Sequence, residues 1–273
     1  YMTADTELVS VIIPAHNCMD LIGDTIESIL AQTHAELEII ICDDASTDDT
    51  WSVLKEYQSR DKRIVLIQNE NNKGPSFTRN RCIQLANSEY VALSDDDDLS
   101  APNRIEKQYM YLKAHDNLVL LGTNMTVCDE SMKEIKQSNF PTSDAGIRGV
   151  FARYFPIVGP SAMFRKSLFL ETNGYLEGHR IAHDYLLYLE LSALGEIANL
   201  SDALYYYRLQ PSSITGKNIS EAHLGSVQVG MTAHLIYKCP ANWLTKIIWV
   251  GRIVIPPLIP TRLMRRISLW FTR

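Results

Sequence analysis

Residues 89–105 read EYVALSDDDDLSAPNRI, so a short apolar run leads directly into four consecutive aspartates. The like charges of these aspartates repel one another. A pair about 4 Å apart costs roughly 1 kcal/mol in bulk water and about 4 kcal/mol near a protein surface. The stretch therefore predicts a buried strand that ends in an acidic loop, with positive charge close by.

The same order, an apolar strand followed by a polar cluster, occurs three more times before this stretch. LVSVII (8–13) precedes PAHN, LEIIIC (37–42) precedes DDASTDD, and RIVLIQ (63–68) precedes NENNKG. Segments with helical spacing separate these strands, which predicts an α/β fold with a mostly parallel central sheet and helices on both faces. Ligands bind beyond the carboxyl ends of such strands, so the four clusters predict one site at that edge.

The composition is that of an ordinary globular protein, with 273 residues, 46% of them hydrophobic. Five scattered cysteines show no metal-binding or redox spacing, which suits the cytoplasm. The net charge of -6 predicts no nucleic-acid partner, but the charge is unevenly distributed. Residues 222–273 contain seven Lys or Arg and no Asp or Glu, so we expect this tail and the rest of the chain to face different partners.

The acidic run has an internal pattern. If the strand at 90–94 continues extended, Asp95 and Asp97 point to one side and Asp96 to the other. Two carboxylates on one side offer hard oxygen ligands suited to Mn²⁺ or Mg²⁺, which bridge to ligand phosphates. The alternative interpretation is a solvated acidic loop.

Four segments together resemble the family 2 glycosyltransferases with the GT-A (Rossmann-like) fold, over roughly residues 8–215. They are VSVIIPAHN, SILAQTHAELEIIICDDASTDDT, NNKGPSFTRNRCIQLANSEYVALSDDDDLSAPNRI and HDYLLYLEL, in this order and spacing. The resemblance implies a GT-A domain at 1–221, with a nucleotide-binding half (1–115) and an acceptor-binding half (116–221). A basic, aromatic-rich helical tail would follow at 222–273.

The resemblance also implies the activity: an inverting transferase of the hexosyltransferase type that takes a nucleotide sugar, expected to be UDP-linked. The acceptor would be a hydroxyl of a saccharide or lipid-linked saccharide in the synthesis of cell-surface polysaccharide or glycoconjugate. Two alternatives stay open. One is a non-catalytic nucleotide-sugar-binding subunit at the membrane, and the other is an enzyme like the nucleotidyltransferases, which would release pyrophosphate.

Site residues are carried over position by position from the resemblance. Asp97 is the expected direct metal ligand and Asp95 a ribose or metal contact. The expected nucleotide-binding residues are Pro14, Ala15, His16, Asn17, Asp44, Arg79, Asp95 and Asp96. The alternatives are that Asp44 belongs to an acidic turn capping the next helix, and that Arg79 is a solvated helix charge or an ion-pair partner of the acidic loops.

In the segment HDYLLYLEL the resemblance implies that Asp184 is the general base that activates the acceptor hydroxyl. The alternative is an aspartate that caps this helix. His183 and Tyr188 depart from the family pattern, which places acceptor recognition in doubt. His183 and Arg208, the latter in YYYRLQPSS, are expected at the acceptor or the diphosphate, and Gln210 stands where the family often has histidine.

Residues 242–273 of the tail mix tryptophans with lysines and arginines, and the longest uncharged run among them, at 253–261, is too short to span a bilayer. This pattern favours peripheral attachment to the anionic cytoplasmic face of a membrane. The alternative is that the apolar residues pack on the catalytic domain or on a twin subunit in a homodimer.

Overall fold

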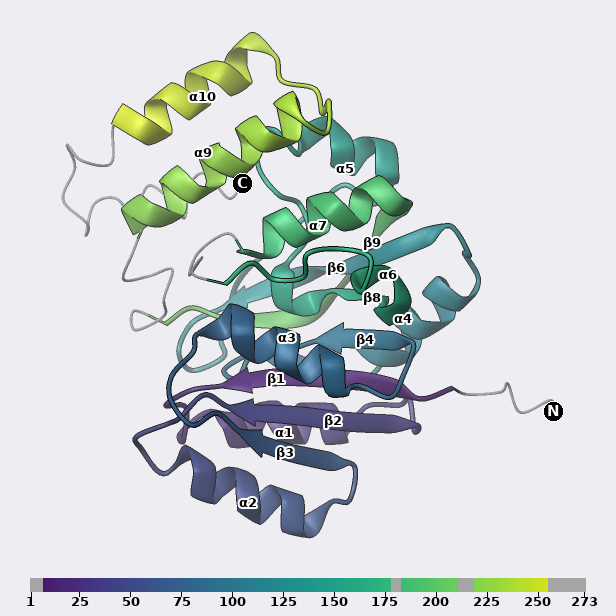
Figure 1. The fold of residues 1–273 in the computed structure, drawn as a ribbon, viewed down its shortest axis with the longest axis vertical. Helices are drawn as coiled ribbons and strands as arrows, with labels where there is room; N and C mark the ends of the chain where they lie inside the picture. Colours follow the sequence, from purple (N-terminus) through teal and green to yellow (C-terminus); the bar gives the residue numbers. More distant parts are fainter. Residues whose placement is uncertain (1–6, 178–182, 211–218, 255–273) are drawn as a thin grey trace.

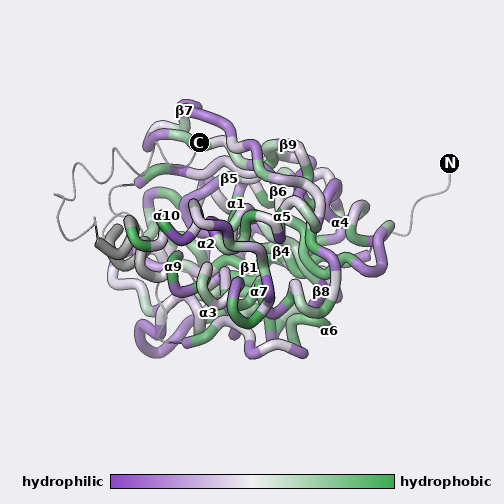
Figure 2. Tube along the Cα trace, turned by 90° about the horizontal axis from the view of Figure 1, so that it is seen from above, coloured by the Kyte–Doolittle hydropathy of each residue, from purple (hydrophilic) through white to green (hydrophobic). Residues whose placement is uncertain are grey.

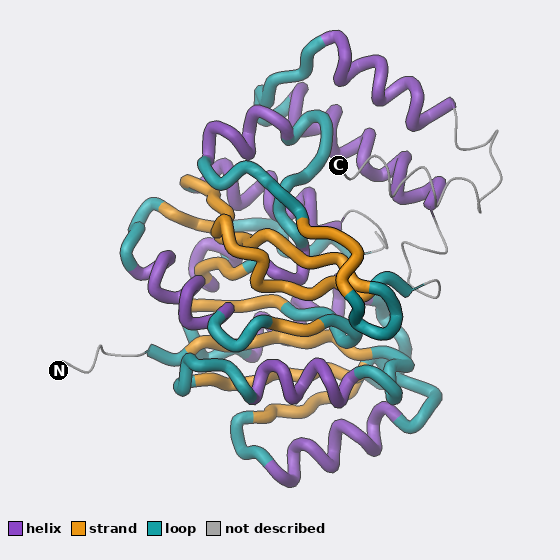
Figure 3. Tube along the Cα trace, turned by 180° about the vertical axis from the view of Figure 1, so that it is seen from behind, coloured by secondary structure: helices purple, strands orange, loops and turns teal. Residues whose placement is uncertain are grey.

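The structure is a computed structural model that describes residues 7–177, 183–210 and 219–254. These residues form one sheet of nine strands in the order β3-β2-β1-β4-β8-β6-β9-β5, with β7 paired to β6 (Figures 1 and 3). The strands are β1 (Val9–Ala15), β2 (Leu37–Asp43), β3 (Ile64–Gln68), β4 (Tyr90–Leu93), β5 (Leu99–Ser100), β6 (Leu118–Cys128), β7 (Glu134–Gln137), β8 (Met163–Arg165) and β9 (Glu196–Arg208).

The predicted α/β architecture is confirmed. The four strands from the N-terminal part, β3, β2, β1 and β4, are parallel neighbours. In the second half β8 runs antiparallel between β4 and β6, while β6 and β9 are parallel. Beyond β8, β7 pairs antiparallel with an extended β6 and forms a hydrophilic arm (Figure 2).

Helices cover both faces of the sheet because its central strands are apolar on both sides. In β1, Ile12 packs in one core cluster, and Val11 and Ile13 pack in the other. Side chains of α3, α5 and α7 join the first cluster, and those of α1, α2 and α4 join the second. The helices are α1 (Ile22–Leu30), α2 (Thr50–Arg60), α3 (Pro75–Leu85), α4 (Arg104–Lys113), α5 (Asp144–Val150), α6 (Lys166–Phe169), α7 (His183–Leu194), α9 (Ile219–Leu235) and α10 (Trp243–Val254), with a 3₁₀ turn η1 (Gly159–Ser161).

The last two described helices, α9 and α10, lie side by side at one end of the molecule, next to α5 and α7 (Figure 1). The indole Nε1 of Trp249 donates to the carbonyl of Ala152 at 2.8 Å. Gly230 on α9 is required at this contact, because a β-carbon there would lie 2.5 Å from the same carbonyl oxygen. The boundary expected at residue 221 falls inside α9. The bond from Trp249 to Ala152 packs the α9–α10 hairpin on the preceding part of the chain.

Among the residues that the structure describes, no helix combines the length and the apolar character needed to cross a bilayer. The tail residues beyond 254, which include Trp270 and Phe271, lie outside the described part of the chain.

Candidate active site

The loops after β1 and β2 are tied together at the carboxyl edge of the sheet. Asn17 and Ala45 adopt positive φ angles of 51° and 54°, which non-glycine residues rarely do outside turns and functional sites. Asn17 Oδ1 accepts from the backbone N–H of Thr47 at 2.8 Å, and the Asp44 N–H donates to the Ala15 carbonyl at 2.8 Å. The predicted nucleotide residues of PAHN and DDAS are therefore adjacent.

Asp44 joins the third polar cluster to the first two. Its carboxylate is buried and accepts from Asn69 Nδ2 at 2.7 Å and from the N–H groups of Lys73 (2.9 Å) and Gly74 (2.8 Å). These bonds use three of the roughly four acceptor positions of a carboxylate. Asp44 thus organises the loop before α3, and one acceptor position is left over for a ligand donor such as a base N–H.

The remaining members of the first loop differ in exposure. Pro14 lies half-buried in β1, whereas His16 is exposed and its Nε2 lies 3.0 Å from Asn72 Nδ2. The His16 N–H donates to Asp96 Oδ2 at 2.9 Å. The Asp96 carboxylate is thus turned toward the first loop, where burial raises its pKa.

Asp95 and Asp97 hold separate partners at the same edge. Arg79 Nη2 donates to Asp95 Oδ1 at 2.5 Å, so Arg79 makes the ion pair with the acidic loop that was one of the two alternatives to a nucleotide contact. Gln210 Nε2 donates to Asp97 Oδ2 at 3.0 Å. Burial, followed by the charges of Asp96 and Asp95, raises the pKa of Asp97 to about 7.

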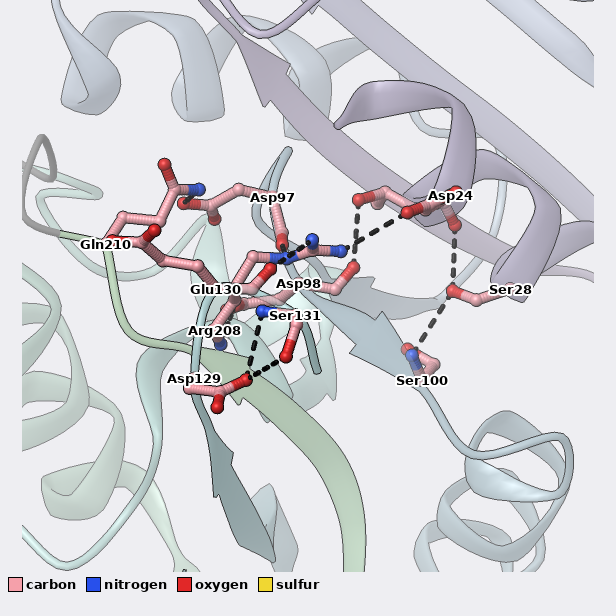
Figure 4. A network of polar contacts seen from close by, with 11 residues as sticks. Asp24, Ser28, Asp97, Asp98, Ser100, Asp129, Glu130, Ser131, Arg208 and Gln210 are labelled. Atoms are coloured by element: carbon pink, nitrogen blue, oxygen red, sulfur yellow. Dashed lines mark hydrogen bonds and ion pairs between the residues drawn. The ribbon is translucent and has the colours of Figure 1, made fainter. Parts of the chain in front are cut away.

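Arg208 is buried and supports the acidic loop from behind (Figure 4). Its backbone N–H donates to Asp98 Oδ1 at 2.7 Å, and its Nε donates to the Asp97 carbonyl at 3.0 Å. Its Nη1 reaches the Glu130 carbonyl at 3.2 Å, and Nη2 lies 3.4 Å from Asp24 Oδ2. Each of the three guanidinium nitrogens thus has a protein partner, and three of its five N–H donors are used in these contacts.

A third arginine, Arg104, lies fully buried beneath the loop. Its Nη1 donates to the carbonyls of Leu93 (3.0 Å) and Pro160 (3.2 Å), and its guanidinium packs 5.3 Å from the ring centre of Tyr205. Burial lowers the pKa of Arg104 to about 10. Arg104 therefore joins the end of β4 to η1. The positive charge next to the four aspartates comes from Arg79, which pairs with Asp95, and from Arg208, whose charge acts on Asp97.

The acidic loop suits a divalent cation with few protein ligands. Among the described residues no group of three His, Cys, Asp or Glu side chains could hold a metal ion. Asp95 and Asp97 nevertheless offer hard carboxylate oxygens, and burial together with the charges of Asp96 and Asp95 raises the pKa of Asp97, so a cation there would favour its ionised form. Mg²⁺ and Mn²⁺ usually complete such sites with water and substrate phosphates, so the residues present fit that arrangement.

Asp184 lies in the first turn of α7, where the helix-cap and general-base interpretations both place it. A β-carbon on Gly159 would lie 2.3 Å from its Oδ2, so the carboxylate rests against the backbone of η1. Tyr188, one turn further along α7, is buried and donates its hydroxyl to the Gly159 carbonyl at 2.8 Å. The charge of Asp184 also helps to raise the pKa of Arg79, after that of Asp95. The side chain of His183 lies outside the described part of the structure.

Sequence reasoning missed Gly159 and Arg104 and the bond from Gln210 to Asp97. Gly159 stands in the unremarkable run FPIVGPSAM, and Arg104 looks like an ordinary helix residue. Their importance comes from contacts between distant segments, for which a single sequence carries no local signal.

Comparison with known proteins identifies the family. The sequence profile described as Glycosyl transferase family 2 matches residues 10–172, more than half of the chain. The chain is a family 2 glycosyltransferase. The EpsE protein of Bacillus subtilis strain 168, named as a glycosyltransferase, is 32% identical over 94% of this chain and 92% of its own length. The UDP-Glc:alpha-D-GlcNAc-diphosphoundecaprenol beta-1,3-glucosyltransferase WfaP of Escherichia coli is 31% identical over 84% of this chain and 89% of its own.

Solved structures confirm the GT-A fold of this glycosyltransferase. Staphylococcus aureus TarS 1–349, solved with UDP, superposes with a TM-score of 0.66 at 21% identity, over 90% of this chain and 71% of that one. The mannosyltransferase PcManGT of Pyrobaculum calidifontis, solved with GDP-Man and Mn²⁺, superposes with a TM-score of 0.60 at 16% identity, over 94% of this chain and 82% of that one. At these identities the likeness concerns the fold alone.

Proposed function

We propose that this glycosyltransferase moves a sugar from a UDP-linked donor to a hydroxyl of a saccharide or lipid-linked saccharide, with inversion, in the synthesis of cell-surface polysaccharide or glycoconjugate. The observation that supports the proposal is that Arg79, which pairs with Asp95 in the acidic loop, also senses the charge of Asp184 on α7. The names of WfaP and of the UDP-bound TarS support a UDP donor, and the name of WfaP supports a lipid-linked acceptor.

The nucleotide would lie over the loops that Asp44 and Asn17 tie together. Asp44 would accept a base N–H at its remaining acceptor position, with the Pro14–Asn17 loop beside it. Asp96, which accepts from the backbone N–H of His16, would fix this loop for the nucleotide. Asp95, which accepts from Arg79, would border the ribose and phosphate side of the donor.

Asp97 and Asp95 would hold Mn²⁺ or Mg²⁺, and such an ion supplies neutralising charge to a departing diphosphate. The Mn²⁺ in the PcManGT structure supports this choice. Arg208 would hold the backbone on which Asp97 and Asp98 stand, and so keep the diphosphate side of the site in place.

Asp184 would take the proton from the acceptor hydroxyl while that oxygen forms a bond to the anomeric carbon. The bond between the anomeric carbon and the diphosphate oxygen breaks in the same displacement. Attack from the face opposite the leaving group converts an α-linked donor into a β-linked product. The acceptor would enter beside α7, where His183 precedes the base in the sequence.

We also propose peripheral attachment to the anionic cytoplasmic face of a membrane through the α9–α10 hairpin and the residues that follow. On α10, Thr245 and Trp249 are buried, whereas Trp243, Ile247 and Val250 are exposed by 72%, 56% and 60%. This outward face, together with the seven cations and no acidic residue of 222–273, complements an anionic bilayer. A second copy would bring like charge against like charge, so the homodimer is the weaker candidate.

One assay tests the activity. A panel of nucleotide sugars with Mn²⁺ is screened for thermal stabilisation, and the donors that stabilise are incubated with GlcNAc-diphosphate-lipid acceptor. Release of UDP with formation of a β-linked product supports the proposal. Release of pyrophosphate would indicate nucleotidyl transfer, and stabilisation without any release would indicate a binding subunit.

A further inference from the structure

Arg79 occupies a position between the two halves of the site. It lies on α3 with only 6% of its surface exposed, which is unusual for an arginine that is meant to meet a mobile ligand. Its Nη2 donates to Asp95 Oδ1 at 2.5 Å. Its guanidinium carbon lies 5.7 Å from the ring centre of the fully buried Tyr175.

Tyr175 belongs to the same buried cluster as Tyr188, which lies one turn from the candidate base on α7. The Tyr188 hydroxyl donates to the Gly159 carbonyl at 2.8 Å. Gly159 is the residue against which the Asp184 carboxylate rests. The charges of Asp95 and Asp184 both raise the pKa of Arg79, so both carboxylates lie within its electrostatic reach.

The residue after Arg79 fixes this arrangement. Asn80 Oδ1 accepts from the Tyr175 N–H at 2.9 Å, and Asn80 Nδ2 donates to the Tyr175 carbonyl at 2.8 Å. The backbone before Tyr175 packs closely on Asn80. Gly174 has a φ of 64°, and a β-carbon there would lie 3.0 Å from Asn80 Oδ1. The side chain of Asn80 thus makes two hydrogen bonds to the backbone of Tyr175, and these bonds hold Tyr175 against the guanidinium of Arg79.

We propose that Arg79 is a positioning residue shared by Asp95 and Asp184, which fixes the donor-side carboxylate and the base relative to each other. This inference rests on the proposed role of Asp184 as base. It differs from a nucleotide contact in what it predicts, because loss of Arg79 should impair the transfer step and leave donor binding almost intact. A misplacement of reacting groups by about 1 Å can cost about 100-fold in rate.

The test compares Arg79→Ala, Arg79→Gln and Arg79→Lys in the full chain. UDP dissociation constants are measured by calorimetry with Mn²⁺, and turnover is measured by UDP release. We expect Arg79→Ala and Arg79→Gln to lower kcat by about 100-fold with a UDP Kd within about threefold of the wild type. Arg79→Lys keeps the charge and is expected to recover part of kcat. Arg79→Gln keeps the side-chain volume in case truncation prevents folding.

Chemical rescue separates the charge from general support of the fold. Guanidinium at tens of millimolar should restore part of the turnover of Arg79→Ala, whereas urea, a planar molecule of similar size without charge, should not. Arg60→Ala, which removes an exposed arginine from α2, serves as the matched control with unchanged kcat and Kd.

Two results would overturn the inference: a UDP Kd that rises in proportion to the loss of kcat/KM while kcat is kept, or wild-type turnover in Arg79→Ala. Failure of the proposed function looks different. In that case Asp184→Asn itself would turn over normally, whatever the Arg79 variants do.

Discussion

The carboxylate of Asp184 rests on the backbone of Gly159, so closely that a β-carbon on residue 159 would stand 2.3 Å from Asp184 Oδ2. Real β-carbons do not approach other atoms to this distance, so one of the two residues must move. Gly159 therefore sets where the candidate base stands.

Gly159→Ala should displace the Asp184 carboxylate and lower kcat by about 10- to 100-fold, because misplacement of the base weakens proton transfer. UDP binding should be unchanged, since Asp44 and the acidic loop are untouched. Turnover and calorimetry report the two quantities. Gly149→Ala on α5 is the matched control, because a β-carbon there meets nothing within 4 Å. Equal turnover in the two variants would show that the position of Asp184 does not matter.

Asp97→Asn should abolish Mn²⁺-dependent turnover, whereas Asp96→Asn should cost far less. The reason is their orientation: Asp97 faces Gln210 at the site, and Asp96 accepts from the His16 N–H on the other side. Steady-state rates of the two variants, measured with and without Mn²⁺, give the loss of turnover in each. Equal losses would mean that the assignment of the aspartate pair to Asp95 and Asp97 is wrong.

The Mn²⁺ affinity should fall as the pH drops below about 7. Burial and the neighbouring aspartates raise the pKa of Asp97 to about 7, so below that pH a proton competes with the metal. One competing proton predicts about a tenfold weaker affinity per pH unit below this pKa. Calorimetric titrations with Mn²⁺ between pH 5 and pH 8 would show the slope. Asp96→Asn removes one of the charges that raise the pKa of Asp97, so the Mn²⁺ affinity of this variant should persist to lower pH.

Asp44→Ala should weaken UDP binding and also destabilise the protein. Three donors, from Asn69, Lys73 and Gly74, lose their acceptor, which predicts about 1–3 kcal/mol of lost stability. Denaturant unfolding and UDP calorimetry give the two values. Asp49→Ala, on an exposed residue of the same loop region, should change neither. A normal UDP affinity in Asp44→Ala would mean that the nucleotide base does not bind at Asp44.

Replacement of Trp243, Ile247 and Val250 together by serine should reduce co-sedimentation with vesicles that contain phosphatidylglycerol. These side chains form the exposed face of α10, whereas Trp249 on the opposite face anchors the helix to Ala152. Leu170→Ser, which removes an exposed leucine at the end of α6, is the control and should bind vesicles normally. Unchanged sedimentation of the triple variant would exclude this face as the membrane contact.

Much of the fold follows from the sequence because its central strands carry strong local patterns. The strands at 8–13, 37–42, 63–68 and 90–94 are apolar runs that end in polar clusters, and the structure places these clusters at one edge. The antiparallel β8 could not be predicted, since three residues give no periodicity and its place between β4 and β6 depends on long-range pairing.

The residues of the candidate site that carry reactive or charged groups in a motif could be predicted from the sequence. The residues that act through packing between distant segments could not. The acidic run and the motif with Asp184 can be recognised from the types of their residues and from their order in the sequence. Gly159, Arg104 and Asn80 act through contacts with residues far away in the chain, and each is unremarkable in its own segment. The contacts of the Arg208 guanidinium with the carbonyls of Asp97 and Glu130 were likewise not predictable, because they join segments far apart in the chain.

The most direct test of the account is the turnover of Asp184→Asn with the donor that best stabilises the wild type. The substitution preserves the size of the side chain and removes its ability to accept a proton. We predict that UDP release in the presence of acceptor falls to the background rate while the donor and Mn²⁺ still raise the unfolding temperature as in the wild type. Release of UDP at the wild-type rate by Asp184→Asn would contradict the account.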